Sequence, residues 1–152
     1  MSVFSHAGDQ FAISTTAQNA DLDQSGFEAL TYTAVGNIGS LGEYGISTNA
    51  LTYDTWNTVV DQKAKGRSNA GDPPLEVARL DSDAGQQAMI VAGAPNYYDA
   101  HAYKVTKQDG HIDYLRGLVG GPVSPSGRNE DFDIHVFTLM LVQAPLPVLA
   151  SV

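Results

Sequence analysis

Short stretches in which apolar and polar residues alternate recur along this chain, and they restrict it to a fold built mainly from β-strands. The alternation is clear in residues 11–16, in 75–80 and at the start of 132–142. A period of two places the apolar side chains on one face of a strand, as in a half-buried sheet. Further strand-like segments lie at 32–38, 56–65, 102–107 and 111–119. The last two flank Asp109-Gly110, a turn pair typical of hairpins.

Helical spacing of apolar residues is clearest in residues 83–92, where a helix of about three turns is expected. Acidic and serine residues just before it can cap its start, and Gly93 is a natural stop. A shorter helical turn is expected at 25–30, with Asp23 or Ser25 as its N-cap.

Six or seven strands, one short helix and one or two helical turns predict a mainly β sandwich or barrel with one flanking α-helix. The chain has 152 residues, which is the length of one domain and enough to bury a core. We therefore expect a single domain over residues 1–152. Residues 1–10 and 143–152 are expected to be extensions of that domain.

Residues 36–55 follow neither period. Glycines at 36, 39, 42 and 45 recur every third residue, but four repeats without proline cannot form a collagen-type helix. We predict an extended loop here. Loops of this length in compact domains are usually functional or disordered.

The charge and cysteine content exclude several classes of function. Acidic residues outnumber basic ones 17 to 8, and the net charge of −9 leaves no basic footprint for binding nucleic acid or an anionic membrane. The absence of cysteine excludes disulfides, cysteine zinc sites and thiol catalysis. The sequence has no apolar run of membrane-spanning length and no signal-peptide pattern, so we expect the product to be assembled in a cytoplasm.

Motifs that would carry catalysis or bind a cofactor are incomplete. The Lys65-Gly66 pair has the reverse order of a Walker loop, and the elbow-like Gly66–Ala70 segment is followed by Pro73-Pro74 rather than a helix. Asp21–Gly26 imitates half of a calcium loop, but Tyr32 stands where the bidentate Glu is needed. The histidines do not have metal-ligand spacing. We therefore expect no cofactor, no metal and no enzymatic activity, with a small hydrolase as the least favoured alternative.

Aromatic residues gather in or near the loops, and the chain ends on an apolar segment. Unpaired strand edges and apolar tails favour association with partners, which indicates a self-assembling protein. An alternative is a β-sandwich carbohydrate-binding module that uses loop aromatics as a stacking platform. The aromatics concerned are Tyr44, Tyr53, Trp56, Tyr97 and Tyr98.

Two groups of motifs carry a family resemblance. Phe27–Gly36 reads FEALTYTAVG and is followed by IGSLGEYG at Ile38–Gly45; further on, KAKG at Lys63–Gly66 precedes LEVARLDSDAGQ at Leu75–Gln86. In order and spacing, over about residues 10–143, this set resembles the major tail tube proteins of long-tailed bacteriophages (siphoviruses) and related gene transfer agents.

The resemblance implies a tail-tube-type β-sandwich or barrel that assembles as hexameric rings stacked into a hollow virion tail tube, the conduit for genome ejection into the host. It implies a tape measure protein, a tail terminator and a distal tail protein as partners, with DNA passing through without specific binding, and assembly in the host cytoplasm. Residues 36–55 would be the loop that contacts the adjacent ring. Its expected contact residues are Leu41, Tyr44, Tyr53 and Trp56.

Two further expectations follow from this interpretation. A conduit wall must not grip DNA, so acidic strand residues are candidates for the lumen: Glu76, Asp113, Asp131 and Asp133. Replacing them with Lys is expected to slow genome ejection without stopping tube assembly. A deletion within residues 39–49 is expected to leave a folded monomer that cannot polymerise.

Overall fold

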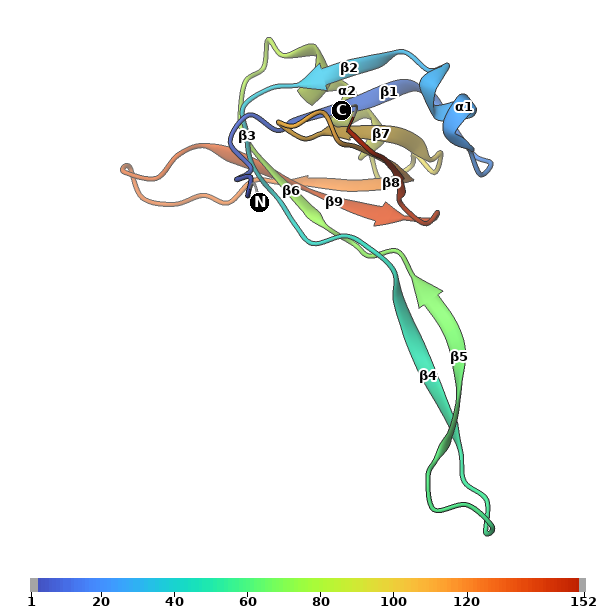
Figure 1. Ribbon diagram of the computed structural model, residues 1–152. Helices are drawn as coiled ribbons and strands as arrows, with labels where there is room; N and C mark the ends of the chain where they lie inside the picture. The colour runs from blue at the N-terminus through green and yellow to red at the C-terminus, as the bar shows by residue number, and fades with distance from the viewer. Residues whose placement is uncertain (1–2, 151–152) are drawn as a thin grey trace.

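The computed structural model describes residues 3–150, in which ten strands and two helices form a body with one long projecting hairpin (Figure 1). In chain order the elements are β1 (Gln10–Ala17), α1 (Gln24–Glu28), β2 (Tyr32–Val35), β3 (Ile38–Leu41), β4 (Ser47–Tyr53), β5 (Gln62–Asn69), β6 (Pro74–Ala78), α2 (Ala84–Ala92), β7 (His101–Thr106), β8 (Ile112–Val123), β9 (Ile134–Leu141) and β10 (Leu146–Val148).

Eight strands form one antiparallel sheet in the order β2-β1-β7-β8-β9-β6-β3, with β10 pairing the first residues of β8. The other two strands, β4 and β5, pair only with each other. The predicted mainly β architecture with a flanking helix is confirmed. The hairpin predicted around Asp109-Gly110 is also confirmed, as β7 and β8.

The large sheet is strongly curved, and the chain itself joins its two edges. Strands β2 and β3 lie at opposite edges but are separated in sequence by Gly36 and Asn37 alone, with Asn37 in the left-handed region at φ 58°. The concave side holds the main core, and α2 packs against it through Met89 and Ala92. The buried side chains of this core include Phe11, Ile13, Leu75, Val77, Tyr103, Leu115, Phe137 and Leu139.

The start of α2 holds the Gly36 corner in place. Gly36 N donates to Asp83 Oδ2 at 3.0 Å, and the same carboxylate caps α2 by accepting from Gln86 N at 2.9 Å. The buried Gln86 amide donates to Gly36 O and Ala78 O, both at 2.9 Å, and accepts from Leu80 N. Because buried polar groups are costly unless paired, this network fixes both the corner and the helix. It also confirms the predicted helix start at Asp83.

Part of the convex side is covered by α1, and Leu146 and Val148 of β10 pack into the same cluster. The buried Phe27 of α1 stacks on Tyr114 of β8 with ring centroids 5.1 Å apart. Asp23 caps α1 by accepting from Gly26 N at 2.8 Å, as one of the two predicted caps. Within the predicted extension 143–152, β10 is a strand of the sheet. The ends of the predicted extensions, residues 1–2 and 151–152, lie outside the described residues.

The prediction of an extended loop at 36–55 is wrong in its extent, because β3 and β4 lie within it. The strand predicted at 56–65 is displaced as well, since β5 begins at Gln62 and continues through part of the predicted turn region. The physical reason is that β4 and β5 expose nearly every residue to solvent. A strand without a buried face has no alternation of apolar residues from which it could be recognised.

Candidate assembly surface

The β4–β5 hairpin is a long arm that points away from the body (Figure 1). It pairs from Ser47 with Asn69 at its root to Tyr53 with Gln62 at its far end. Its neighbours in the chain, β3 and β6, pair with each other in the sheet, so the arm continues a ribbon whose root belongs to the body. A two-stranded hairpin is marginally stable alone in water. The arm therefore has surface to contribute to an interface.

The two faces of the arm differ in chemistry. Cross-strand partners share a face, so Leu51 and its partner Ala64 form an exposed apolar face that Tyr53 continues. Lys63 and Lys65 lie on the opposite face. The arm is thus an amphipathic ribbon exposed on both sides.

The arm also differs from the body in charge. Residues 47–69 contain three basic and two acidic residues and have a net charge of +1. Because the whole chain has a net charge of −9, the other residues together have a net charge of −10. The three basic residues are Lys63, Lys65 and Arg67, and the two acidic ones are Asp54 and Asp61.

The tip of the arm, residues 54–61, presents apolar side chains to solvent. Trp56 and Val59 are fully exposed and Val60 is 71% exposed. The tip is held in shape by a hydrogen bond of 2.6 Å between the hydroxyls of Thr55 and Thr58. Clustered exposed apolar side chains mark an interaction site.

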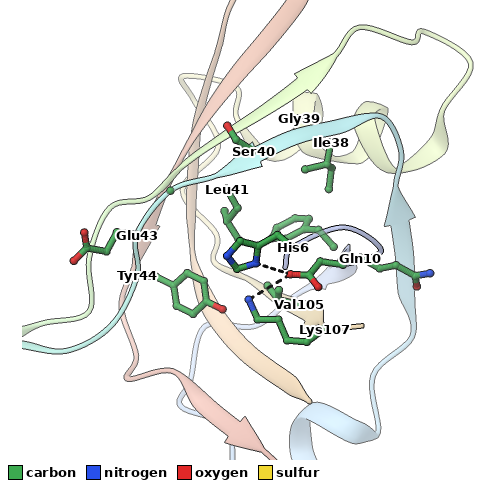
Figure 2. A pocket seen from close by; sticks show the side chains of 13 residues that line it. His6, Gln10, Ile38, Gly39, Ser40, Leu41, Glu43, Tyr44, Val105 and Lys107 are labelled. Carbon is green, nitrogen blue, oxygen red and sulfur yellow. Dashed lines mark hydrogen bonds and ion pairs between the residues drawn. The ribbon is translucent and has the colours of Figure 1, made fainter. Parts of the chain in front are cut away.

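A cavity of about 470 Å³ lies near the root of the arm, where β1 and β7 face β3 and the segment after it (Figure 2). Its apolar lining comes from Phe11, Ile38, Leu41, Tyr44 and Val105, and its polar lining includes His6, Asp9, Gln10, Glu43 and Lys107. Asp9 is bound within the rim, where it lies 2.9 Å from His6 Nδ1 and 3.6 Å from Lys107 Nζ. The exposed Glu43 has no such partner among the described residues.

Tyr44 is anchored beside this cavity. Its hydroxyl donates to Asp113 Oδ2 at 2.6 Å, and the other carboxylate oxygen lies 2.9 Å from His111 Nε2. Burial raises the pKa of the Tyr44 phenol, and the Asp113 carboxylate adds to the rise. The segment that leads into the arm is therefore fixed to β8 of its own subunit.

We expect Tyr44→Phe to lower the free energy of unfolding by about 1.5–3 kcal/mol at pH 7, because it removes a hydrogen bond to a charged group. The raised folded-state pKa means that the phenol stabilises the fold fully below about pH 10, its ordinary value, and that this contribution falls at higher pH. The variant should lose stability less steeply than wild type above pH 10. Urea unfolding at pH 7 and in alkaline buffer measures both effects; equal slopes would contradict the assignment.

The structure separates the four predicted contact residues into two groups. Leu41 and Tyr44 line the cavity near the root, whereas Tyr53 and Trp56 lie at the far end of the arm. Sequence reasoning missed Val59 and Val60, although an apolar pair within a polar segment was a usable signal. It also missed Phe11 and Val105, which the pattern marks only as core residues.

The four predicted lumen acids lie in three different surroundings, and their lumen role stays a prediction. Glu76 alternates with the buried Leu75 and Val77 and therefore lies on the convex side of the sheet. Asp113 accepts a hydrogen bond from Tyr44, which lines the cavity. The other two precede β9: Asp133 forms an ion pair of 2.6 Å with Arg79, and Asp131 accepts from Arg128 N.

Residues 3–150 contain no cluster of three or more His, Asp or Glu side chains placed to hold a metal ion. No helix among them has the length and apolar character needed to span a membrane.

No protein-family model matches this sequence, and no curated protein matches it either. Solved structures do share its fold. A chain of the PVC sheath/tube terminator of an extracellular contractile injection system, in the extended state, has a TM-score of 0.67 at 12% identity and covers 98% of this chain and 99% of its own. A chain of the 6-fold symmetrised anti-feeding prophage (AFP) baseplate has a TM-score of 0.64 at 10% identity, covering 100% and 99%. A chain of the PVC sheath-tube complex in the extended state has a TM-score of 0.60 at 14% identity and covers 92% of this chain and 87% of its own. At identities this low, the structural likeness establishes the fold alone.

Proposed function

We propose that this chain is a structural, non-enzymatic subunit of a phage-tail-like tube and that it polymerises as stacked hexameric rings. The observation that carries the proposal is the projecting arm, with its exposed apolar tip, on a body whose sheet has two free edges. Chains of a sheath/tube terminator and of a sheath-tube complex of an extracellular contractile injection system share the fold, over 98% and 92% of this chain. A chain of a 6-fold symmetrised anti-feeding prophage baseplate shares it as well. The motif resemblance to siphovirus tail tube proteins points to the same role.

Lateral contacts in the ring would use the sheet edges β2 and β3. An unpaired edge presents backbone donors and acceptors to another chain, and contacts repeated around an axis close into a ring. The convex face of β9 supports a channel-lining role, because Thr138 and Met140 remain exposed there. Glu76 lies on the same side of the sheet, so it is the best placed of the candidate lumen acids, with Asp131 and Asp133 nearby in the chain.

In this role the tube is a conduit through which a genome passes into the host without specific binding. A tape measure protein, a tail terminator and a distal tail protein would be the partners, and assembly in the host cytoplasm would precede incorporation into the tail. The acidic body is consistent with a wall that leaves phosphates without fixed partners. Lysine at Glu76, Asp131 and Asp133 should slow ejection from assembled particles while leaving the tubes intact.

Electron microscopy of the purified chain over a concentration series tests the proposal. Annular rings or striated tubes support it. A monomer at every concentration that binds oligosaccharides would instead support a carbohydrate-binding module. The structure gives that alternative little support, because Tyr44 and Trp56 lie at opposite ends of the arm and Tyr97 stacks on His101. The loop aromatics therefore do not form one stacking platform.

The charge difference between arm and body predicts a salt-sensitive assembly. Reversing Lys63 and Lys65 to Glu should raise the critical concentration for tube formation by about tenfold or more, because it places like charges at the interface with an acidic body. High salt should narrow the difference from wild type, since it screens exposed charges. Arg128→Glu is the control, an equal reversal per site in an exposed loop of the body. A wild-type critical concentration in the double variant would refute this prediction.

A further inference from the structure

Two apolar features at opposite ends of the arm lack a partner within the described chain. At the far end, Trp56, Val59 and Val60 project into solvent. Near the root, the cavity between β1 and β3 is open and lined by apolar side chains. We propose that the tip of the arm of one copy inserts into the root cavity of a second copy. This inference rests on the proposed function and names the contact through which rings would stack.

The size of the cavity suits this occupant. Its volume of about 470 Å³ lies within the range of pockets that hold small-molecule ligands, about 300–1,000 Å³. An indole ring with a neighbouring branched side chain therefore has room inside it. Ile38, Leu41 and Tyr44 are partly exposed in the lining and offer the apolar surface that such groups seek, with the buried Phe11 and Val105 behind them. Burial of the exposed tip against these side chains supplies the driving force for docking.

The polar groups at the two ends are complementary as well. The indole N–H of Trp56 is a donor that seeks an acceptor when it is buried. Asp9 lines the cavity, where it is already paired with His6 and Lys107. Glu43 is exposed at the outer side, and its carboxylate points away from the other labelled side chains (Figure 2). Lys63 lies two residues after the tip, on the basic face of the arm. Insertion of the tip would bring this ammonium group to the acidic side of the rim.

A second copy is the occupant because the geometry separates the two features within one chain. The arm places its tip far from the body, and the seven residues of β4 alone span roughly 23 Å as a strand. A tip that enters the root cavity of another copy leaves its own root cavity free for the next one. Such a head-to-tail contact does not close on itself and repeats without limit. This is the contact that a stack of rings needs.

Trp56 reports on the insertion without any label, because it is the single tryptophan of the chain. Its fluorescence should shift to shorter wavelength and resist acrylamide quenching when tubes form. Emission that stays at the wavelength of an exposed indole in assembled tubes would overturn the proposal. This measurement detects burial of the tip, and a crosslink is needed to identify the surface that covers it.

The absence of cysteine from the chain allows a clean crosslinking test. Asn57→Cys at the tip is combined with Gln10→Cys at the exposed edge of the cavity, and assembled tubes are treated with a short thiol-to-thiol crosslinker. The pair should give a ladder of covalent oligomers on a denaturing gel, because each copy would be joined to two others. Each single variant should give dimers at most. The matched control combines Asn57→Cys with Ser82→Cys, an exposed position before α2.

The outcomes separate this inference from the proposed function. A ladder from the Gln10 pair that is absent from the Ser82 pair supports insertion into the cavity. Tubes that form without that ladder, or with a ladder from the Ser82 pair alone, overturn the inference and leave the tube function standing. Failure of the wild-type chain to form rings or tubes at any concentration overturns both.

Discussion

Replacement of residues 47–69 by a short Gly-Ser turn is expected to yield a folded monomer that no longer forms tubes. Strands β4 and β5 pair only with each other and contribute no residue to the two core clusters. Gly45 N donates to Ala70 O at 3.1 Å, so the ends left by the deletion are already adjacent. The eight-stranded sheet should therefore survive while the proposed stacking surface is lost.

Circular dichroism and a cooperative unfolding transition test whether the truncated chain is folded. Electron microscopy tests whether it forms tubes. Normal tubes from the truncated chain would show that the arm is dispensable for assembly. The structure also corrects the deletion that the sequence suggested, within residues 39–49. That cut removes most of β3 (Ile38–Leu41), which pairs with β6, and would damage the sheet itself.

Gly85→Ala is expected to destabilise the fold by about 3 kcal/mol, a large share of the 5–15 kcal/mol typical of a domain. A Cβ at this position would lie 2.1 Å from Ala34 O and 2.7 Å from Val35 Cα, so α2 would be forced away from β2. In an exposed helix the same change is stabilising by about 1 kcal/mol, so the sign of the effect identifies the contact.

Chemical denaturation of Gly85→Ala and of Gln87→Ala, an exposed position in the same helix, provides the comparison. The Gln87 variant should match wild type within about 0.5 kcal/mol. If Gly85→Ala were as stable as wild type, α2 would not be packed on β2 as closely as described. Loss of this contact would also disturb the corner at Gly36, which the first turn of α2 holds.

The elements that could be predicted from sequence are those with a local signal. Asp83 and Gly93 mark the ends of α2 because capping depends on residues adjacent in the chain. The Asp109-Gly110 turn predicts the β7–β8 hairpin for the same reason. β4 and β5 were missed because a ribbon exposed on both faces has no core to impose alternation.

The candidate site depends on contacts that no local pattern contains. The cavity joins Phe11 of β1 to Val105 of β7 and to the segment after β3, and only the strand order of the sheet brings them together. The sequence pattern also does not show on which face of β8 Asp113 lies. Ile112 and Tyr114 pack on one side of β8 and Leu115 packs on the other. The alternation of apolar residues therefore does not show which side of β8 faces the main core. Tyr53 and Trp56 could be recognised as contact candidates because they are aromatic residues in a segment without a core pattern.

The continuity of the arm with β3 and β6 has a mechanical consequence. The arm leaves the body along the direction of these two paired strands, so tension on its tip acts parallel to them (Figure 1). Backbone hydrogen bonds in an antiparallel pair run perpendicular to the strands. Because β3 and β6 join the arm at the same end, tension pulls them together, and the load falls on the ladder between β6 and β9. Several bonds there share the load in shear rather than breaking one after another, so a filament hooked together by such arms would resist stretching at every joint.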